Sequence, residues 1–283
     1  MYNCLIFEGG GILGISYVGA IKCLNEHNLL LNINKFGGSS AGSQFATLLS
    51  LEYKIDEIEH LLLNQKMEEF KDGSFGFIRN IWRLINDYGY YKGEYLYIYF
   101  DKLIEQKLNK KDATFLDLYN YNSNILKITG TCLTTQSTEV FDYISTPDMP
   151  IAKAIQISSC FPYFFKPVIY NNKIYIDGGC LKNLPKNIFD DDDDVDECLV
   201  YELVGKNDDY NIKINNITSY SLSIFNCIYL AANRCRINTD KVTLIKIDTC
   251  NYNILDLSIK KEDKEILIKN GYDATFNNIN HLQ

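Results

Sequence analysis

The sequence CLIFEGGGILG at residues 4–14 and the sequence KFGGSSAG at residues 35–42 decide the fold. In the first, an apolar run at 4–7 leads into glycines, and apolar residues then recur at helical spacing over 12–28. In the second, the run 35–38 leads into small residues, and helical spacing continues from Phe45 to Leu51. Each stretch therefore predicts a strand, a tight turn and a helix in succession.

The rest of the chain continues this alternation of strands and helices. It indicates an α/β fold with a central, mostly parallel sheet and helices on both faces. No linker rich in Pro, Gly or Ser divides the chain, so we expect residues 1–283 to form a single domain. The expected further strands are 125–131, 139–143, 173–177, 198–204 and 242–248, and the expected further helices are 150–159, 218–236 and 262–276.

The composition is that of a globular chain, with 46% apolar and 23% charged residues, which excludes disorder over its whole length. The net charge of −8 is concentrated in one place, because seven acidic residues lie between 190 and 197 and the remainder is close to neutral. Such a chain has no basic field for binding nucleic acid. The acidic run itself predicts a solvated, mobile loop, and it lacks the spaced ligands and turn glycine of a calcium site.

The cellular setting is predicted from what the sequence does not contain. No stretch approaches the roughly 18 apolar residues that a membrane span requires, and residues 1–8 lack the basic region that opens a secretory signal. The nine cysteines include no C-x-x-C pair, which argues against a disulfide framework and against a cysteine-based zinc site. We therefore expect a cytoplasmic protein with reduced thiols, soluble or peripheral to membranes.

The glycines of the first turn, Gly9, Gly10, Gly11 and Gly14, match the pattern G-x-G-x-x-G. Their exposed N–H groups and the following helix N-terminus predict an anion site. A dinucleotide-binding oxidoreductase would place an acidic residue at the end of the second strand, where this chain has glycine and serine. The turn therefore favours another use, namely to bind the oxyanion of an acyl-transfer reaction. The nucleotide interpretation stays an alternative, which a cofactor titration followed by intrinsic fluorescence would test.

The second turn, Gly38-Ser39-Ser40-Ala41-Gly42, matches the G-x-S-x-G nucleophile elbow. In that motif a sharp strand-to-helix turn presents a serine Oγ at the end of a sheet. A Gly/Ser turn that merely caps a helix explains the same residues. The position directly after a predicted strand and before an apolar helix favours Ser40 as a nucleophile.

The base that would activate Ser40 is not expected to be a histidine. The chain has three: His27 ends the first helix, His60 lies in a helical run, and His281 is two residues from the C-terminus. A carboxylate is therefore the better candidate, and Asp177 ends an apolar strand just before two glycines. An aspartate that only initiates a turn before Gly-Gly would explain the same position.

Three separated motifs resemble those of the patatin-like phospholipases. They are the segment from Glu8 to Gly14, the segment 38–42, and Asp177-Gly178-Gly179 with Asn183 and Pro185 following. The stretch 157–167 resembles the family's sequence ahead of its D-G-G motif, so the likeness covers about residues 4–185. It implies a modified α/β-hydrolase sheet, a Ser–Asp dyad and hydrolysis of lipid acyl esters through an acyl-enzyme, with no metal or organic cofactor.

The resemblance also assigns roles to individual residues. Ser40 would be the nucleophile, Asp177 its base, and N–H groups of Gly9, Gly10, Gly11 and Gly14 the oxyanion hole, while Gly38, Gly42, Gly178 and Gly179 would support the motifs. Leu13 stands where the family often has Arg or Lys, so backbone donors and the helix dipole would stabilise the oxyanion without help from a cation. These motifs do not distinguish phospholipase, lysophospholipase and triacylglycerol lipase activities. They also do not determine positional preference or oligomeric state.

Aromatic residues crowd segment 75–100 and recur at 161–165. We expect most of them to pack in the core, and some to line an acyl groove or to meet a membrane surface. Trp82, with Arg79 and Arg83, suits an interfacial helix, which makes transient membrane contact a hypothesis. The alternative from another class is a catalytically silent lipid-binding or regulatory protein of the same fold, against which the intact Ser40 and Asp177 argue.

Overall fold

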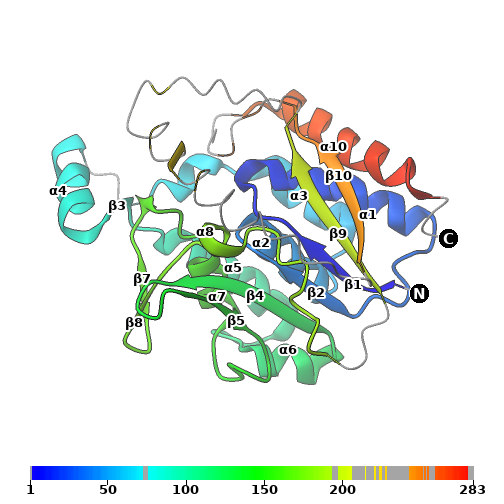
Figure 1. Cartoon of the computed structure of the whole chain (residues 1–283), viewed down its shortest axis with the longest axis horizontal. Helices are drawn as coiled ribbons and strands as arrows, with labels where there is room; N and C mark the ends of the chain where they lie inside the picture. Colours follow the sequence, from blue (N-terminus) through cyan, green and yellow to red (C-terminus); the bar gives the residue numbers. More distant parts are fainter. Residues whose placement is uncertain are drawn as a thin grey trace.

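A computed structural model of the chain describes residues 2–72, 76–192, 197–205, 242–250 and 259–279, together with residues 214, 220, 223, 224, 227, 252 and 254. Its centre is a mixed sheet with the strand order β10-β9-β1-β2-β4-β8-β7, and β5 also pairs with β4 (Figure 1). The run from β10 to β4 is parallel, whereas β5, β7 and β8 are antiparallel to their neighbours. The strands are β1 (Tyr2–Phe7), β2 (Lys35–Gly38), β4 (Ile125–Cys132), β5 (Ser137–Phe141), β7 (Val168–Tyr170), β8 (Lys173–Ile176), β9 (Glu197–Val204) and β10 (Val242–Asp248).

The strand β1 lies in the middle of the parallel part, between β2 and β9. It is almost entirely buried, which explains why its sequence is a continuous apolar run without polar alternation. Phe7 is in register with Gly38 of β2 and with Tyr201 of β9. The strands therefore end side by side, so the two turns that follow β1 and β2 meet at the carboxyl edge of the sheet.

Helices cover one face of the sheet, and a shorter segment covers the other. The larger core lies under α1, α2, α5, α7 and α10 and includes Leu5 and Phe7 of β1. On the opposite face, Leu184, Ile188 and Phe189 pack with Ile6 and other strand residues. The helical elements are η1 (Gly11–Ile15), α1 (Ser16–Glu26), α2 (Ala41–Ser50), α3 (Ile55–Asn64), η2 (Met67–Phe70), α4 (Phe77–Asp87), α5 (Glu94–Leu108), α6 (Phe115–Asn122), α7 (Ile151–Ser158), α8 (Gly179–Lys182) and α10 (Lys261–Phe276).

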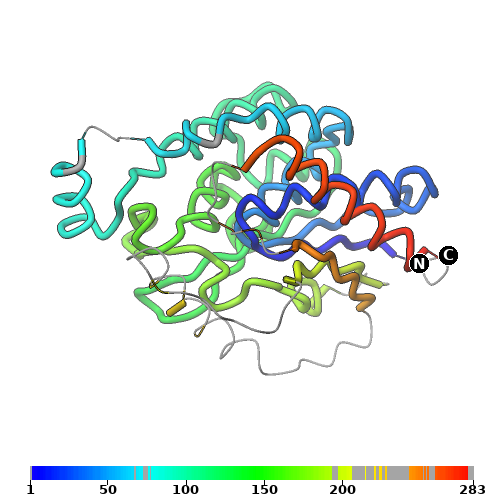
Figure 2. The backbone as a smooth tube through the Cα atoms, turned by 90° about the horizontal axis from the view of Figure 1, so that it is seen from above, coloured from blue at the N-terminus to red at the C-terminus, as the bar shows by residue number. Residues whose placement is uncertain are grey.

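The helices α1 and α10 lie side by side although they come from opposite ends of the chain (Figure 2). Gly19 of α1 and Gly271 of α10 permit this contact. A Cβ at Gly19 would lie 1.7 Å from Ile268 O, and one at Gly271 would lie 1.9 Å from Ser16 O. Any side chain at either position would force the two backbones apart.

The predicted α/β architecture, with its mostly parallel sheet flanked by helices, is confirmed. All seven predicted strands are present within one or two residues at their ends, as are the predicted helices 150–159 and 262–276. The first predicted helix begins as η1 before α1, and the predicted helix 218–236 lies largely outside the described residues. Three short strands were not predicted: β7, and the pair β3 (Gly89–Tyr91) and β6 (Tyr163–Phe165), which form a separate parallel ribbon.

The acidic run is not wholly a solvated loop, which corrects the sequence-based expectation. Asp192 forms an ion pair with Lys127 of β4 at 2.5 Å, and both side chains are largely buried, at 15% and 8% exposure. Glu197 begins β9, and residues 193–196 lie outside the described residues. Buried Lys127 requires a partner, and the nearest end of the acidic run supplies it. Across the described ranges, none of the helices is long and apolar enough to span a bilayer.

Candidate active site

Ser40 lies at the sharp turn between β2 and α2, where the backbone is strained. Its φ of +49° and ψ of −124° are unusual for a residue with a side chain. The Ser40 N–H donates a 2.8 Å hydrogen bond to the Oγ of Ser158, at the end of α7. Ser40 is half-buried, so it keeps access to solvent. The turn matches the geometry of a nucleophile elbow, in which strain and a fixed N–H hold the hydroxyl in place.

The glycines on either side of Ser40 are required by close backbone packing. A Cβ at Gly42 would lie 2.3 Å from Phe7 O, and a Cβ at Gly38 would lie 2.5 Å from the carbonyl carbon of Gly42. The first turn of α2 therefore presses against the end of β1. This contact explains why G-x-S-x-G requires glycine at both ends in this protein.

Asp177 follows β8 and meets Ser40 across the carboxyl edge of the sheet. The Ser40 hydroxyl donates a 2.9 Å hydrogen bond to Asp177 Oδ2. The N–H of Gly179 donates to Asp177 Oδ1 at 2.7 Å, and the Asp177 N–H donates to Cys160 O at 3.0 Å. The carboxyl group is thus held at both oxygens and through its own backbone.

The environment of Asp177 favours a carboxyl group that can exchange protons near neutrality. The residue is 3% exposed. Burial raises the pKa of Asp177 to about 7, although the hydrogen bonds from Gly179 and Ser40 act in the opposite direction. A carboxylate with such a pKa can serve as a general base.

The glycine turn after β1 approaches Ser40 directly, since a Cβ at Gly9 would lie 3.1 Å from the Ser40 Cβ. The N–H of Gly9 is already bonded to Asn183 O at 3.0 Å. Among the described residues, the N–H groups of Gly10 and Gly11 have no acceptor, and Gly11 adopts a φ of +54°. Gly14 lies within η1, where a Cβ would be 3.1 Å from that of Ala41. The four predicted glycines thus differ. Gly10 and Gly11 carry available N–H donors, whereas Gly9 and Gly14 allow close packing against Ser40 and Ala41.

A buried polar network, whose members have no role assigned by the sequence motifs, fixes this glycine turn. Glu8 is 2% exposed and accepts hydrogen bonds from the N–H of Leu203, at 2.7 Å, and from Asn183 Nδ2, at 3.1 Å. The same Asn183 nitrogen donates to Gly9 O at 2.8 Å. Asn183 was visible in the sequence as part of the third motif, and Glu8 as a charge at the end of an apolar strand. Ser158 had no comparable signal, because its contact with Ser40 spans 118 residues.

The described histidines lie away from the Ser40–Asp177 pair, as predicted. His27 follows α1, where Nδ1 is 2.9 Å from Cys23 O and the ring lies beside Phe276. His60 is exposed on α3, and His281 is outside the described residues. Within the part of the chain that the structure describes, no cluster of His, Cys, Asp or Glu has the arrangement of a metal site.

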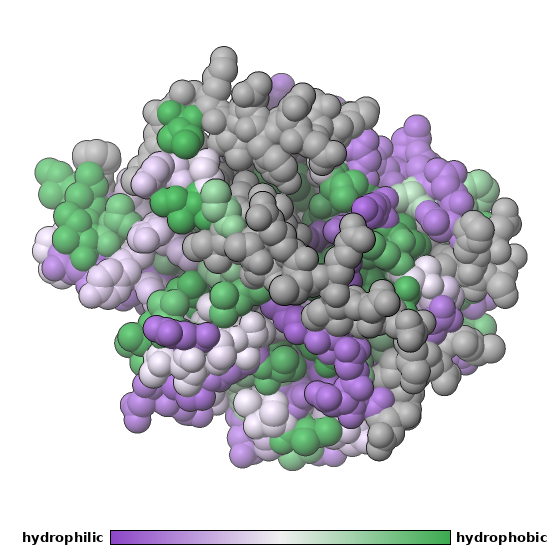
Figure 3. Space-filling view, viewed as in Figure 1, coloured by the Kyte–Doolittle hydropathy of each residue, from purple (hydrophilic) through white to green (hydrophobic). Residues whose placement is uncertain are grey.

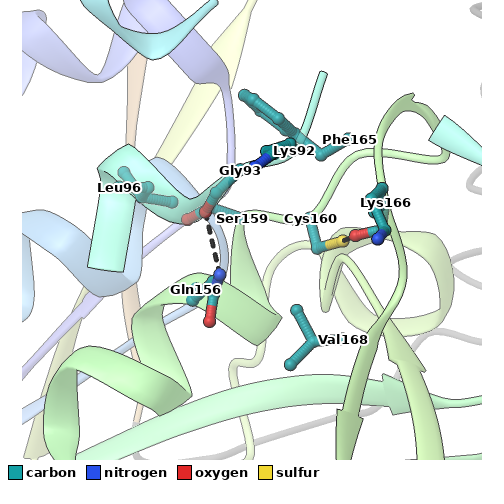
Figure 4. Close-up of a pocket in the computed structure, with 9 residues that line it drawn as sticks. All are labelled: Lys92, Gly93, Leu96, Gln156, Ser159, Cys160, Phe165, Lys166 and Val168. Atoms are coloured by element: carbon teal, nitrogen blue, oxygen red, sulfur yellow. Dashed lines mark hydrogen bonds between the residues drawn. The ribbon is translucent and has the colours of Figure 1, made fainter. Parts of the chain in front are cut away.

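A small recess lies between α5, the end of α7 and the strands β6 and β7 (Figure 4). Ser40 and Asp177 do not line it, but Cys160, whose carbonyl holds the Asp177 N–H, does. Gln156 closes one side through a 2.8 Å hydrogen bond to Gly93 O. The site therefore centres on the Ser40–Asp177 pair, with this recess beside it. Its lining residues are Lys92, Gly93, Leu96, Gln156, Ser159, Cys160, Phe165, Lys166 and Val168.

The site thus combines a serine elbow, hydrogen-bonded to a buried aspartate, with a glycine turn in which the N–H groups of Gly10 and Gly11 have no acceptor among the described residues. A family model for patatin-like phospholipases matches residues 5–190, more than half of the chain, and the chain belongs to that family. This membership supports a lipid hydrolase.

The chain is also similar to curated proteins and to a solved structure. Uncharacterized protein R571 of Acanthamoeba polyphaga mimivirus is 30% identical over 275 residues, which cover 94% of this chain and 90% of that protein. Probable lipid hydrolase 463L of Invertebrate iridescent virus 6 is 29% identical over 196 residues, 66% of this chain and 63% of that protein. The crystal structure of VipD from Legionella pneumophila superposes with a TM-score of 0.66 at 20% identity, over 99% of this chain and 67% of that one. The last likeness concerns the fold alone.

Proposed function

We propose that this protein is a serine acyl hydrolase that cleaves acyl esters of phospholipids or related lipids, in the manner of a phospholipase A or lysophospholipase. The observation that carries the proposal is the 2.9 Å hydrogen bond from Ser40 Oγ to Oδ2 of the buried Asp177, at the carboxyl edge of the sheet. The family and its probable lipid hydrolase relative support lipid esters as the substrate class.

In the first half of the reaction, Asp177 accepts the Ser40 proton as Ser40 Oγ attacks the ester carbonyl carbon. The tetrahedral intermediate collapses when Asp177 returns that proton to the leaving alkoxide oxygen, which releases the alcohol and leaves an acyl-serine. In the second half, Asp177 takes a proton from water, the resulting hydroxide attacks the acyl carbon, and the proton passes back to Ser40 Oγ. The fatty acid is released. A pKa near 7 suits both directions of proton transfer.

Backbone donors stabilise the oxyanion in this mechanism. The N–H groups of Gly10 and Gly11 are available among the described residues, and so is that of Ala41, which directly follows Ser40. A donor after the nucleophile and donors from a second loop form the oxyanion hole of α/β-hydrolases. Gly9 and Gly14 then act by close packing. Leu13 is 5% exposed and brings no charge, so neutral donors perform this stabilisation.

In this function residues 1–283 act as one catalytic domain, because strands from both ends of the chain join in one sheet. The protein works in a reducing compartment such as the cytoplasm, a setting that fits the eight described cysteines, which are all free thiols. It makes transient contact with a membrane surface, where the substrates reside.

The test is hydrolysis of a soluble chromogenic short-chain ester and of fluorescent phospholipid vesicles by the full chain. Ser40→Ala and Asp177→Asn should each abolish both activities while circular dichroism stays unchanged. A fluorophosphonate should label the wild type and not Ser40→Ala. Labelling without turnover would mean a reactive serine whose lipid is still missing from the assay. Absence of both labelling and hydrolysis would reject the proposal in favour of a silent lipid-binding protein, which the intact dyad now argues against.

A further inference from the structure

The helix α4 presents an apolar face to solvent. Ile78, Trp82 and Ile85 lie at positions i, i+4 and i+7, so they share one side of the helix. They are 84%, 60% and 69% exposed, and Tyr88 directly after the helix is 65% exposed. Figures 1 and 2 both show α4 standing away from the body, and Figure 3 shows apolar residues gathered at this end. An exposed patch of this kind marks an interaction surface.

The orientation of α4 is fixed by its polar side, which faces the protein. Arg83 is 5% exposed and donates a 2.7 Å hydrogen bond from Nη1 to Tyr90 O, on the neighbouring strand β3. Asn80 is 1% exposed and its Oδ1 lies 3.4 Å from the same Arg83 nitrogen. In an ordinary surface helix the apolar stripe faces the core. Here the polar residues anchor the helix and leave the apolar residues outward.

This apolar surface is connected to the active site through the ribbon of β3 and β6. Gly89 of β3, two residues after α4, pairs with Tyr163 of β6, which is itself 58% exposed. The rings of Tyr91 and Phe164 also meet across the ribbon, 4.9 Å apart. β6 follows Ser158, the residue that holds the Ser40 N–H, by only a few positions. Whatever binds α4 is therefore brought to the side of the molecule that carries the site.

The charges around α4 indicate whether it fits an anionic or a zwitterionic membrane surface. Residues 66–94 contain five basic and five acidic side chains, a net charge of zero, and the whole chain carries −8. Lys166 beside the helix is paired with Asp87 at 3.3 Å. Binding to an anionic surface requires an excess of Lys and Arg, which this region lacks. Apolar side chains with a tryptophan among neutralised charges fit the headgroup region of a zwitterionic bilayer.

We propose that Ile78, Trp82 and Ile85 of α4 insert into the headgroup region of zwitterionic phospholipid membranes and thereby hold the active site at the lipid surface. The inference rests on the proposed lipid hydrolase function, because that function makes a lipid membrane the expected partner of α4. It is specific in two respects: insertion is driven by apolar burial, so anionic lipid is not required, and it is confined to one helix.

Trp82 supplies the measurement, because it is the single tryptophan of the chain. The Ser40→Ala protein is mixed with phosphatidylcholine vesicles, or with the same vesicles containing one third phosphatidylserine. We expect a blue shift of the tryptophan emission and co-sedimentation with both, little affected by salt. The double variant Ile78→Ser with Ile85→Ser retains the probe and should bind about a hundredfold more weakly, since each lost side chain contributes roughly a factor of ten. The matched control, Leu31→Ser with Ile144→Ser, removes side chains that are 80% and 68% exposed elsewhere and should bind normally.

Three results would overturn the proposal: no shift with either vesicle, binding only with phosphatidylserine, or a shift that grows with protein concentration in the absence of lipid. The last would mean that a second copy of the chain covers α4. Because binding is measured with Ser40→Ala, it does not depend on catalysis. Hydrolysis of the soluble ester without vesicle binding would reject this inference alone. Vesicle binding by a protein whose wild type shows neither ester hydrolysis nor fluorophosphonate labelling would reject the proposed function alone.

Discussion

Replacing Asp177 with asparagine should abolish activity and, above neutral pH, stabilise the protein. Asparagine keeps the shape of the side chain, and its oxygen can still accept from the N–H of Gly179. Its amide can donate to Ser40 Oγ in place of accepting from it. What the substitution removes is an ionisable group that is fully enclosed in the native protein.

The magnitude follows from the pKa of Asp177, which burial raises from an ordinary 3.8 to about 7. Below about pH 4 the carboxyl group is protonated in both states and contributes no difference. Between about pH 4 and pH 7 the unfolded chain has lost the proton and the native protein retains it, so stability falls as the pH rises. Above pH 7 the native protein must hold the buried charge, at a cost of roughly 4 kcal/mol. Asparagine has no ionisable proton, so the stability of the variant lacks this dependence on pH.

Urea denaturation of both proteins at pH 5, 6, 7 and 8 measures the effect. The stability of Asp177→Asn relative to the wild type should rise by about 2–3 kcal/mol from pH 5 to pH 8, mostly below pH 7. Asp148→Asn is the matched control, because Asp148 is an exposed aspartate that the fold does not enclose. In parallel, kcat/KM of the wild type should rise with pH through about 7, as the base loses its proton. A stability difference that is constant with pH, or that shrinks as the pH rises, would refute a buried carboxyl group with a raised pKa.

Three further substitutions test the surroundings of the site. Ser158→Ala should lower kcat and destabilise the protein by about 1–3 kcal/mol, because the elbow N–H loses its acceptor; Ser159→Ala should retain most of the kcat, and equal losses would contradict a specific role of Ser158. Asn183→Ala should reduce kcat more than KM by loosening the glycine turn, and steady-state kinetics showing a change in KM alone would count against it. Lys127→Met should lower the free energy of unfolding by roughly 3 kcal/mol, since it leaves Asp192 unpaired, and kcat should not change. An unchanged urea denaturation curve would mean that the ion pair contributes little to stability.

Much of the fold could be predicted from the sequence because its signals are local. About 25 residues contain the apolar run 4–7, the glycines after it and the helical spacing that follows. The short strands β3, β6 and β7 could not be found in this way, since three residues carry no periodicity. The partner of Asp192 was also hidden, because Lys127 lies 65 residues away and is reached only when β4 is in place.

The glycines divide in the same way. Those of the two turns were visible as motifs, whereas Gly19 and Gly271 looked like ordinary helix residues. Their importance appears only when α1 and α10 are packed, because each glycine faces the backbone of the other helix. Likewise, the sequence suggested an interfacial helix from Trp82 with Arg79 and Arg83. No local signal states that Arg83 turns inward, or that Ile78 and Ile85 share the exposed side with Trp82.

By itself, the sequence determined the order of strands and helices and the chemical groups offered at three turns: a serine at an elbow, a row of glycines and an aspartate before glycine. Local conformation depends on neighbouring residues, so these features could be predicted without the fold. The tertiary structure decided which groups meet. It brings together Ser40 and Asp177, which are 137 residues apart in the chain, and it leaves the N–H groups of Gly10 and Gly11 available among the described residues while that of Gly9 is engaged. The reason is physical: strand register and helix packing set these distances, and only burial in the assembled protein raises the pKa of Asp177.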